Sequence, residues 1–131
     1  MNKKMTIILS FLAVIAVVFL SNINKADCCN TYKKISFDEM DDKIKENDNY
    51  LIVDVRTLVE YNEGHIENSV LIPDYEIERI NDIEPDKNKT IYVYCRSGNR
   101  SKTATNKILE MGYTNVYDVG GIIDYNGNIV K

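Results

Sequence analysis

The sequence has few of the residues that cross-link a small protein or bind metals: it contains three cysteines and one histidine. Cys28 and Cys29 are adjacent and Cys95 stands alone, so they form no disulfide framework. A structural zinc site needs four closely spaced ligands, and no such spacing is present. We therefore expect no metal and no cofactor. The sequence assigns no role to Cys28 and Cys29.

Basic residues are also scarce relative to acids. From Cys28 to Lys131 there are 13 Lys and Arg against 19 Asp and Glu, a net charge of −6. This balance argues against nucleic-acid binding, which requires a basic surface. The stretch 87–109 is an exception, because its six charged residues are all cations. Such a stretch either attracts a small anion or is a solvated surface with chance clustering. Its cations are Lys87, Lys89, Arg96, Arg100, Lys102 and Lys107.

The N-terminal 27 residues differ from the rest of the chain. Two lysines precede residues 5–24, which carry no charge, and residues 7–20 are apolar apart from Ser10. A basic start and an apolar run are typical of a secretory signal peptide. The uncharged stretch also reaches the roughly 20 residues of a membrane anchor. A buried helix of a soluble domain is the third alternative. We expect residues 1–27 to direct export, to the periplasm, the cell exterior or the outer face of the cytoplasmic membrane.

The remaining chain, residues 30–131, is long enough for one domain with one core. It contains no repeat, no low-complexity segment and no internal linker. Helical and strand patterns alternate, which predicts a mostly parallel sheet with helices on both faces. The expected strands are 50–53, 70–72, 90–94 and 115–119, and the expected helices are 37–46, 58–63, 75–83 and 101–111.

The six-residue loop Cys95–Arg100 connects the strand 90–94 to the next helix. In open α/β sheets, sites lie beyond the carboxyl ends of the strands. Gly98 permits a tight turn whose inward N–H groups bind an anion, and the helix N-terminus adds positive charge. A thiol placed there ionises readily to the nucleophilic thiolate. The alternative, an inert buried cysteine, would need no surrounding donors.

Several short motifs follow one another in an order and spacing that are specific as a set. They are Asp54-Val55-Arg56, Glu60-Tyr61, Gly64-His65-Ile66, Pro73, Cys95 to Ser101 and Gly120-Gly121. With these motifs, the chain from about residue 35 to residue 130 resembles a single-domain rhodanese. Two positions depart from that family's pattern: Tyr125 stands where Trp is usual, and Glu67 where Pro is usual. The resemblance implies a five-stranded, mostly parallel sheet flanked by helices.

The resemblance further implies transfer of sulfane sulfur. The Cys95 thiolate would attack the outer sulfur of thiosulfate or a similar anion, release sulfite and become a persulfide. A thiol or cyanide would then accept the sulfur. Asp54, Arg56 and His65 are expected to support the site structurally, with Asp54 near enough to pair with a loop arginine. The residues expected to bind substrate are Arg96, Ser97, Gly98, Asn99, Arg100 and Ser101.

Electrostatics explains the composition of the loop. Two unit charges 4 Å apart repel by about 4 kcal/mol at an effective dielectric of 20, and a dianion meeting a thiolate feels roughly twice that. One hydrogen bond to a charged group offsets about 1.5–3 kcal/mol. Several amides and at least one arginine are therefore needed. We expect Arg96 and Arg100 to neutralise the donor.

Two other functions use the same residues. A membrane-tethered module would carry a persulfide for a partner without turning over. A cysteine phosphatase or arsenate reductase also places Cys in an anion-binding loop, but tyrosine phosphatases have one residue more between Cys and Arg. The shorter loop from Cys95 to Arg100 favours one sulfur atom over a tetrahedral phosphate. We expect a monomer.

Overall fold

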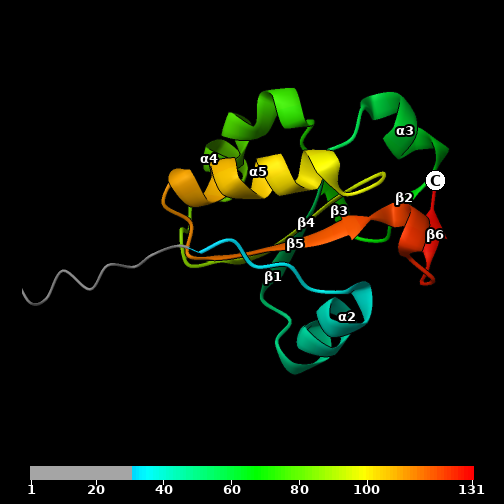
Figure 1. Ribbon diagram of the computed structural model, residues 1–131, viewed down its shortest axis with the longest axis horizontal. Coiled ribbons are helices and arrows are strands. Elements are labelled where there is room, and N and C mark those ends of the chain that lie inside the picture. The colour runs from blue at the N-terminus through cyan, green and yellow to red at the C-terminus, as the bar shows by residue number, and fades with distance from the viewer. Residues whose placement is uncertain (1–30) are drawn as a thin grey trace, which may run out of the picture.

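The computed structural model describes residues 31–131, which fold around a four-stranded parallel sheet (Figure 1). The predicted export segment, residues 1–27, lies outside the described residues and stays a prediction. Within the described part, no helix has the length and apolar character needed to cross a membrane. The strand order is β3 (Ser69–Leu71), β1 (Tyr50–Asp54), β4 (Thr90–Cys95) and β5 (Asn115–Gly121).

Helices cover both faces of this sheet, which confirms the predicted architecture. Helix α2 packs on one face, and α4 and α5 pack on the other (Figure 1). Two short 3-10 helices, η1 and η2, follow β3 and β5. The helices are α2 (Phe37–Glu46), α3 (Leu58–Glu63), η1 (Asp74–Arg79), α4 (Ile80–Ile83), α5 (Asn99–Glu110) and η2 (Ile122–Asp124).

The core has two layers, because successive side chains of a strand point to opposite faces. In β4, Ile91, Val93 and Cys95 belong to the layer under α5, while Tyr92 and Tyr94 belong to the layer under α2. All five are almost fully buried. Each buried apolar side chain stabilises the fold by roughly 1.5–3 kcal/mol. This burial on both faces holds the carboxyl end of β4 rigidly.

Local sequence signals set where the helices begin. Ser36 and Glu39 form a capping box at the start of α2, which begins at the predicted residue, Phe37. Thr57 and Glu60 form a second one at α3. Helix α5 begins at Asn99, two residues before the predicted start, because Gly98 turns the chain with a φ of 103° and no side-chain cap is needed.

The expected fifth parallel strand is replaced by a shorter contact at the sheet edge. Within residues 31–131, a single parallel bridge joins Lys34 to Asp118 beside β5. A separate antiparallel pair, β2 (His65–Ile66) and β6 (Ile129–Val130), was not predicted. The predicted helix 75–83 consists of η1 followed by α4, and Glu76, within η1, has non-helical backbone angles.

Candidate functional site

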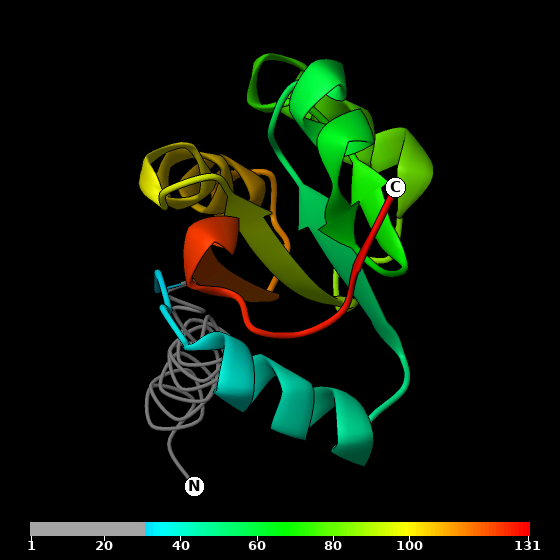
Figure 2. The ribbon, with the colours of Figure 1, turned by 90° about the vertical axis from the view of Figure 1, so that its right-hand side faces the viewer.

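Cys95 is the last residue of β4, so it lies at the carboxyl edge of the sheet, the side of the molecule that faces the viewer in Figure 2. Its side chain is buried, at 1% exposure. The Gly98 N–H donates to Cys95 Sγ over 3.0 Å. This amide reaches the sulfur because Gly98 is in the left-handed region, which other residues rarely adopt. The loop therefore carries a hydrogen-bond donor aimed at the Cys95 sulfur.

The double glycine at the end of β5 packs directly against this loop. A Cβ on Gly121 would lie 2.4 Å from the Arg96 carbonyl oxygen and 2.6 Å from Ser97 Cα. No side chain fits there. The Ile123 N–H donates to the same Arg96 oxygen over 3.3 Å. The end of β5 and η2 thus fix the loop backbone from one side.

The two loop arginines have different surroundings. Arg100 makes two hydrogen bonds to the Glu60 carboxylate, at 2.8 and 2.9 Å. These bonds lower the pKa of Glu60 to about 2 and raise the pKa of Arg100. Glu60 also accepts from the Thr57 backbone N–H, so α3 holds Arg100 firmly. Arg96 is exposed and makes no ion pair within residues 31–131. Arg96, rather than Arg100, is the free cation at this site.

The remaining loop side chains face different directions. Asn99 and Ser97 are both exposed at the loop surface. Ser101 is fully buried, and its Oγ lies 2.7 Å from Asp118 Oδ1 and 3.1 Å from the Gly98 carbonyl oxygen. The Ser101 side chain therefore lies beneath the loop and not at its mouth, where the sequence led us to expect it.

Asp54 and Arg56 pair with each other at the end of β1. The Arg56 guanidinium donates to both Asp54 oxygens over 2.7–3.1 Å, and both residues are buried. Arg56 also donates to the Gly64 carbonyl oxygen over 2.7 Å. Asp54 therefore does not pair with a loop arginine. The acid that pairs with one is Glu60, whose partner is Arg100. Through its bond to Gly64, the Asp54–Arg56 pair holds the backbone just before β2 in place.

His65 packs flat on Tyr61, with ring centroids 3.7 Å apart. Its Nδ1 lies 2.9 Å from the Tyr61 carbonyl oxygen. These contacts fit the structural part that the sequence gives His65. Among the described residues, no group of three or more His, Cys, Asp or Glu is placed to hold a metal ion.

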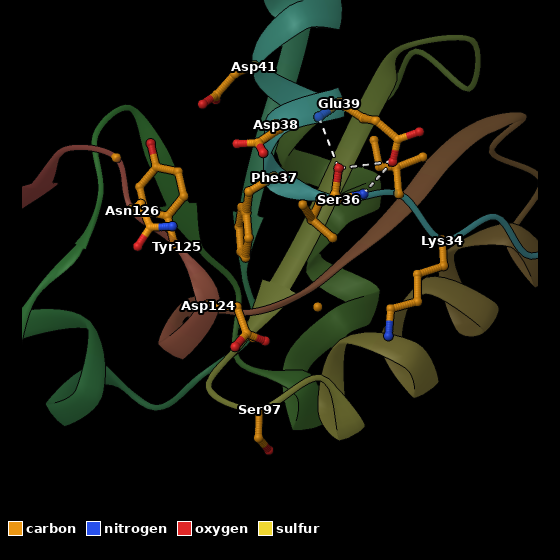
Figure 3. A pocket seen from close by; sticks show the side chains of 15 residues that line it. Lys34, Ser36, Phe37, Asp38, Glu39, Asp41, Ser97, Asp124, Tyr125 and Asn126 are labelled. Atoms are coloured by element: carbon orange, nitrogen blue, oxygen red, sulfur yellow. Dashed lines mark hydrogen bonds between the residues drawn. The ribbon is translucent and has the colours of Figure 1, made fainter.

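A groove of about 670 Å³ lies on the α2 side of the loop (Figure 3). Phe37 and Tyr125 form its apolar part, with ring centroids 4.9 Å apart. Tyr125, which stands in place of the family's usual Trp, therefore has a defined packing partner. The groove reaches the loop at Ser97, whose side chain points away from the two rings. Four carboxylates and one cation, Lys34, also line it, so its net charge is negative and does not suit an anionic donor.

Sequence reasoning missed two residues of this site. Glu60 stands out in the sequence only as part of a family motif, and Asp118 does not stand out at all. Their partners Arg100 and Ser101 lie 40 and 17 positions away in the chain. A single sequence carries no signal for such distant pairs.

Comparison with known proteins agrees with this geometry. Residues 36–126 match the family model of the rhodanese-like domain. The chain is 42% identical over 73 residues to the thiosulfate sulfurtransferase PspE of Escherichia coli, covering 55% of this chain and 70% of PspE. It is 34% identical over 105 residues to a tRNA uridine(34) hydroxylase of Yersinia pestis. That match covers 76% of this chain and 29% of the hydroxylase.

Solved structures show the same fold. A rhodanese with anions from E. coli aligns with a TM-score of 0.60 at 40% identity, covering 63% of this chain and 98% of that chain. A rhodanese-related protein from Thermoplasma volcanium aligns with a TM-score of 0.64 at 31% identity, covering 76% and 98%. These similarities support a sulfurtransferase-type function. With its matching domain, its parallel sheet and Cys95 at the end of β4, the chain belongs to the rhodanese-like domain family.

Proposed function

We propose that this protein transfers sulfane sulfur from thiosulfate, or a similar anion, to a thiophilic acceptor through a Cys95 persulfide. The observation that carries the proposal is the Gly98 N–H, held 3.0 Å from Cys95 Sγ at the N-terminus of α5. An amide and a helix N-terminus both stabilise a thiolate, which is the reactive form of cysteine.

The reaction needs no oxidant. The Cys95 thiolate attacks the outer sulfur of thiosulfate, a new S–S bond forms, and the old one breaks with its electron pair leaving on sulfite. The persulfide then carries the negative charge. A nucleophile such as cyanide attacks its outer sulfur, leaves as thiocyanate and returns the Cys95 thiolate. The same Gly98 donor serves a charged sulfur at both stages.

In this proposal the two loop arginines, Arg96 and Arg100, have different electrostatic roles. Arg96 is free and exposed, so it attracts and partly neutralises the donor. Arg100 is already paired with Glu60, so it contributes less net charge and mainly fixes the first turn of α5 against α3. The sequence led us to expect both arginines to neutralise the donor, and the proposal now gives this role mainly to Arg96.

The test is intact-mass analysis after thiosulfate treatment. We expect the protein to gain one sulfur atom, to lose it on addition of cyanide, and to turn over repeatedly. Cys95→Ser should gain none, whereas Cys28→Ser combined with Cys29→Ser should behave as the wild type. A sulfur adduct without turnover would favour the carrier function instead. Phosphate release from a phosphotyrosine mimic, with no adduct, would favour the phosphatase.

The name of the Yersinia relative does not extend this proposal. The chain spans only 29% of that hydroxylase, so most of that protein has no counterpart in the match. PspE, of which the chain covers 70%, is the better guide to the donor.

A further inference from the structure

Asp118 is a buried carboxylate beneath the Cys95 loop. It lies in β5 and is 1% exposed. Burying a carboxylate is costly unless other groups compensate it. The other buried acid of the described chain, Asp54, is compensated by Arg56. Asp118 makes no ion pair within residues 31–131, so its burial requires another explanation.

Three hydrogen-bond donors take the place of a cation. Asp118 Oδ1 accepts from Ser101 Oγ over 2.7 Å and from the Gly120 N–H over 2.9 Å. Asp118 Oδ2 accepts from the Tyr32 hydroxyl. Burial, together with the adjacent carboxylate, raises the pKa of Tyr32, which keeps its proton available for this bond. The donors come from the first turn of α5, the double glycine and the segment before α2.

Two of these donors, Ser101 and Gly120, lie next to Gly98, whose N–H donates to Cys95 Sγ. Ser101 Oγ also lies 3.1 Å from the carbonyl oxygen of Gly98, the residue whose N–H donates to Cys95 Sγ. Gly98 in turn lies beside Gly120: a Cβ on Gly98 would meet Gly120 Cα at 3.7 Å, an ordinary van der Waals distance. A change at Asp118 would therefore release the Ser101 side chain and the Gly120 backbone, the two groups that lie against Gly98.

We propose that Asp118 is a positioning residue for sulfur transfer: it holds Ser101 and Gly120 so that the Gly98 N–H points at Cys95 Sγ. This inference rests on the proposed function, because it assumes that Cys95 reacts as a thiolate. The Tyr32 hydroxyl also connects Asp118 to the segment before α2. In that segment, Lys33 and Ile35 make backbone hydrogen bonds with Asp118.

The test measures how fast iodoacetamide alkylates Cys95 as a function of pH, in the full chain with Cys28 and Cys29 replaced by serine. Asp118→Asn and Ser101→Ala should both move the midpoint of the profile to higher pH by about one unit, because the bond from Gly98 to the thiolate weakens. Alkylation below the midpoint should then fall about tenfold.

The direction in which the alkylation midpoint moves distinguishes a positioning role of Asp118 from an effect of its negative charge alone. If Asp118 acted only as a negative charge, its removal would favour the thiolate and move the midpoint of Asp118→Asn downward, while Ser101→Ala would leave it unchanged. Arg100, whose charge also interacts with Cys95, is present in both variants. A downward or absent shift in Ser101→Ala would overturn the proposal, even if Asp118→Asn failed to fold.

A matched control tests for mere destabilisation. Tyr113→Phe removes a buried hydroxyl that bonds the Ile80 and Glu84 carbonyl oxygens, away from the loop. It should lower the free energy of unfolding without moving the alkylation midpoint. Because alkylation needs no sulfur donor, a failure of thiosulfate turnover in the wild type would count against the proposed function alone.

Discussion

Glu60 gains its low pKa from Arg100, and this links the stability of the protein to pH. The carboxylate is deprotonated well below its ordinary pKa of 4.5, with a folded value of about 2. A lowered pKa means that the pair stabilises the fold above about pH 4.5, and that this contribution is lost as pH falls toward 2. The two side chains are 23% and 31% exposed, so solvent screening keeps the contribution modest.

We expect Glu60→Gln to lower the free energy of unfolding by about 1 kcal/mol at pH 7, with the difference disappearing near pH 2. Urea denaturation at a series of pH values measures it. Glu63→Gln is the control, because Glu63 lies on the same helix and makes no ion pair within the described residues. Parallel acid-induced losses in the wild type and Glu60→Gln would show that the pair does not contribute.

At the level of secondary-structure elements, the end of β5 supports the Cys95 loop through Gly121. We expect Gly121→Ala to lower kcat/KM for thiosulfate about 100-fold, because the new methyl would displace the loop backbone. Gly112→Ala is the matched control: its φ of 96° costs about 1 kcal/mol of stability, but the added methyl meets no atom within 4 Å. Equal activity in the two variants would show that the close approach at Gly121 is unimportant.

The sequence predicted those elements that have a local signal. The strand at 90–94 is a run of β-branched and aromatic residues, and α2 has a capping box, so both were placed correctly. The pair β2 and β6 was missed because two-residue strands have no periodicity and their partners lie over 60 positions apart. The loop was found from its own residues. Its supports, Glu60 and Asp118, were not, because they meet it only through the fold.

Over the whole molecule, the basic stretch 87–109 is divided between two ends of the sheet. Lys87 and Lys89 lie by the amino end of β4, where Lys89 pairs with Glu84 and Lys87 bonds Asn81. Cys95 is at the carboxyl end of the same strand, six residues and about 20 Å from Lys89 at 3.3 Å per residue. Of the six cations, Arg96 is the one that lies in the loop and is not paired within the described chain. The stretch is therefore not one anion-attracting surface.

This division predicts how salt affects turnover of thiosulfate. Arg96→Gln should lower kcat/KM about tenfold at low ionic strength, because a charge next to the donor is removed. That ratio should shrink as sodium chloride is added, since part of the attraction of an exposed charge is screened. Lys87→Gln combined with Lys89→Gln should stay within about twofold of the wild type at 0.1 M salt and above, because the separation of about 20 Å from Lys89 to Cys95 exceeds the screening length of about 10 Å at 0.1 M. Steady-state rates at several salt concentrations measure both variants. An equal loss in the lysine variant would mean that the donor is attracted by the charge of the whole stretch and not by Arg96.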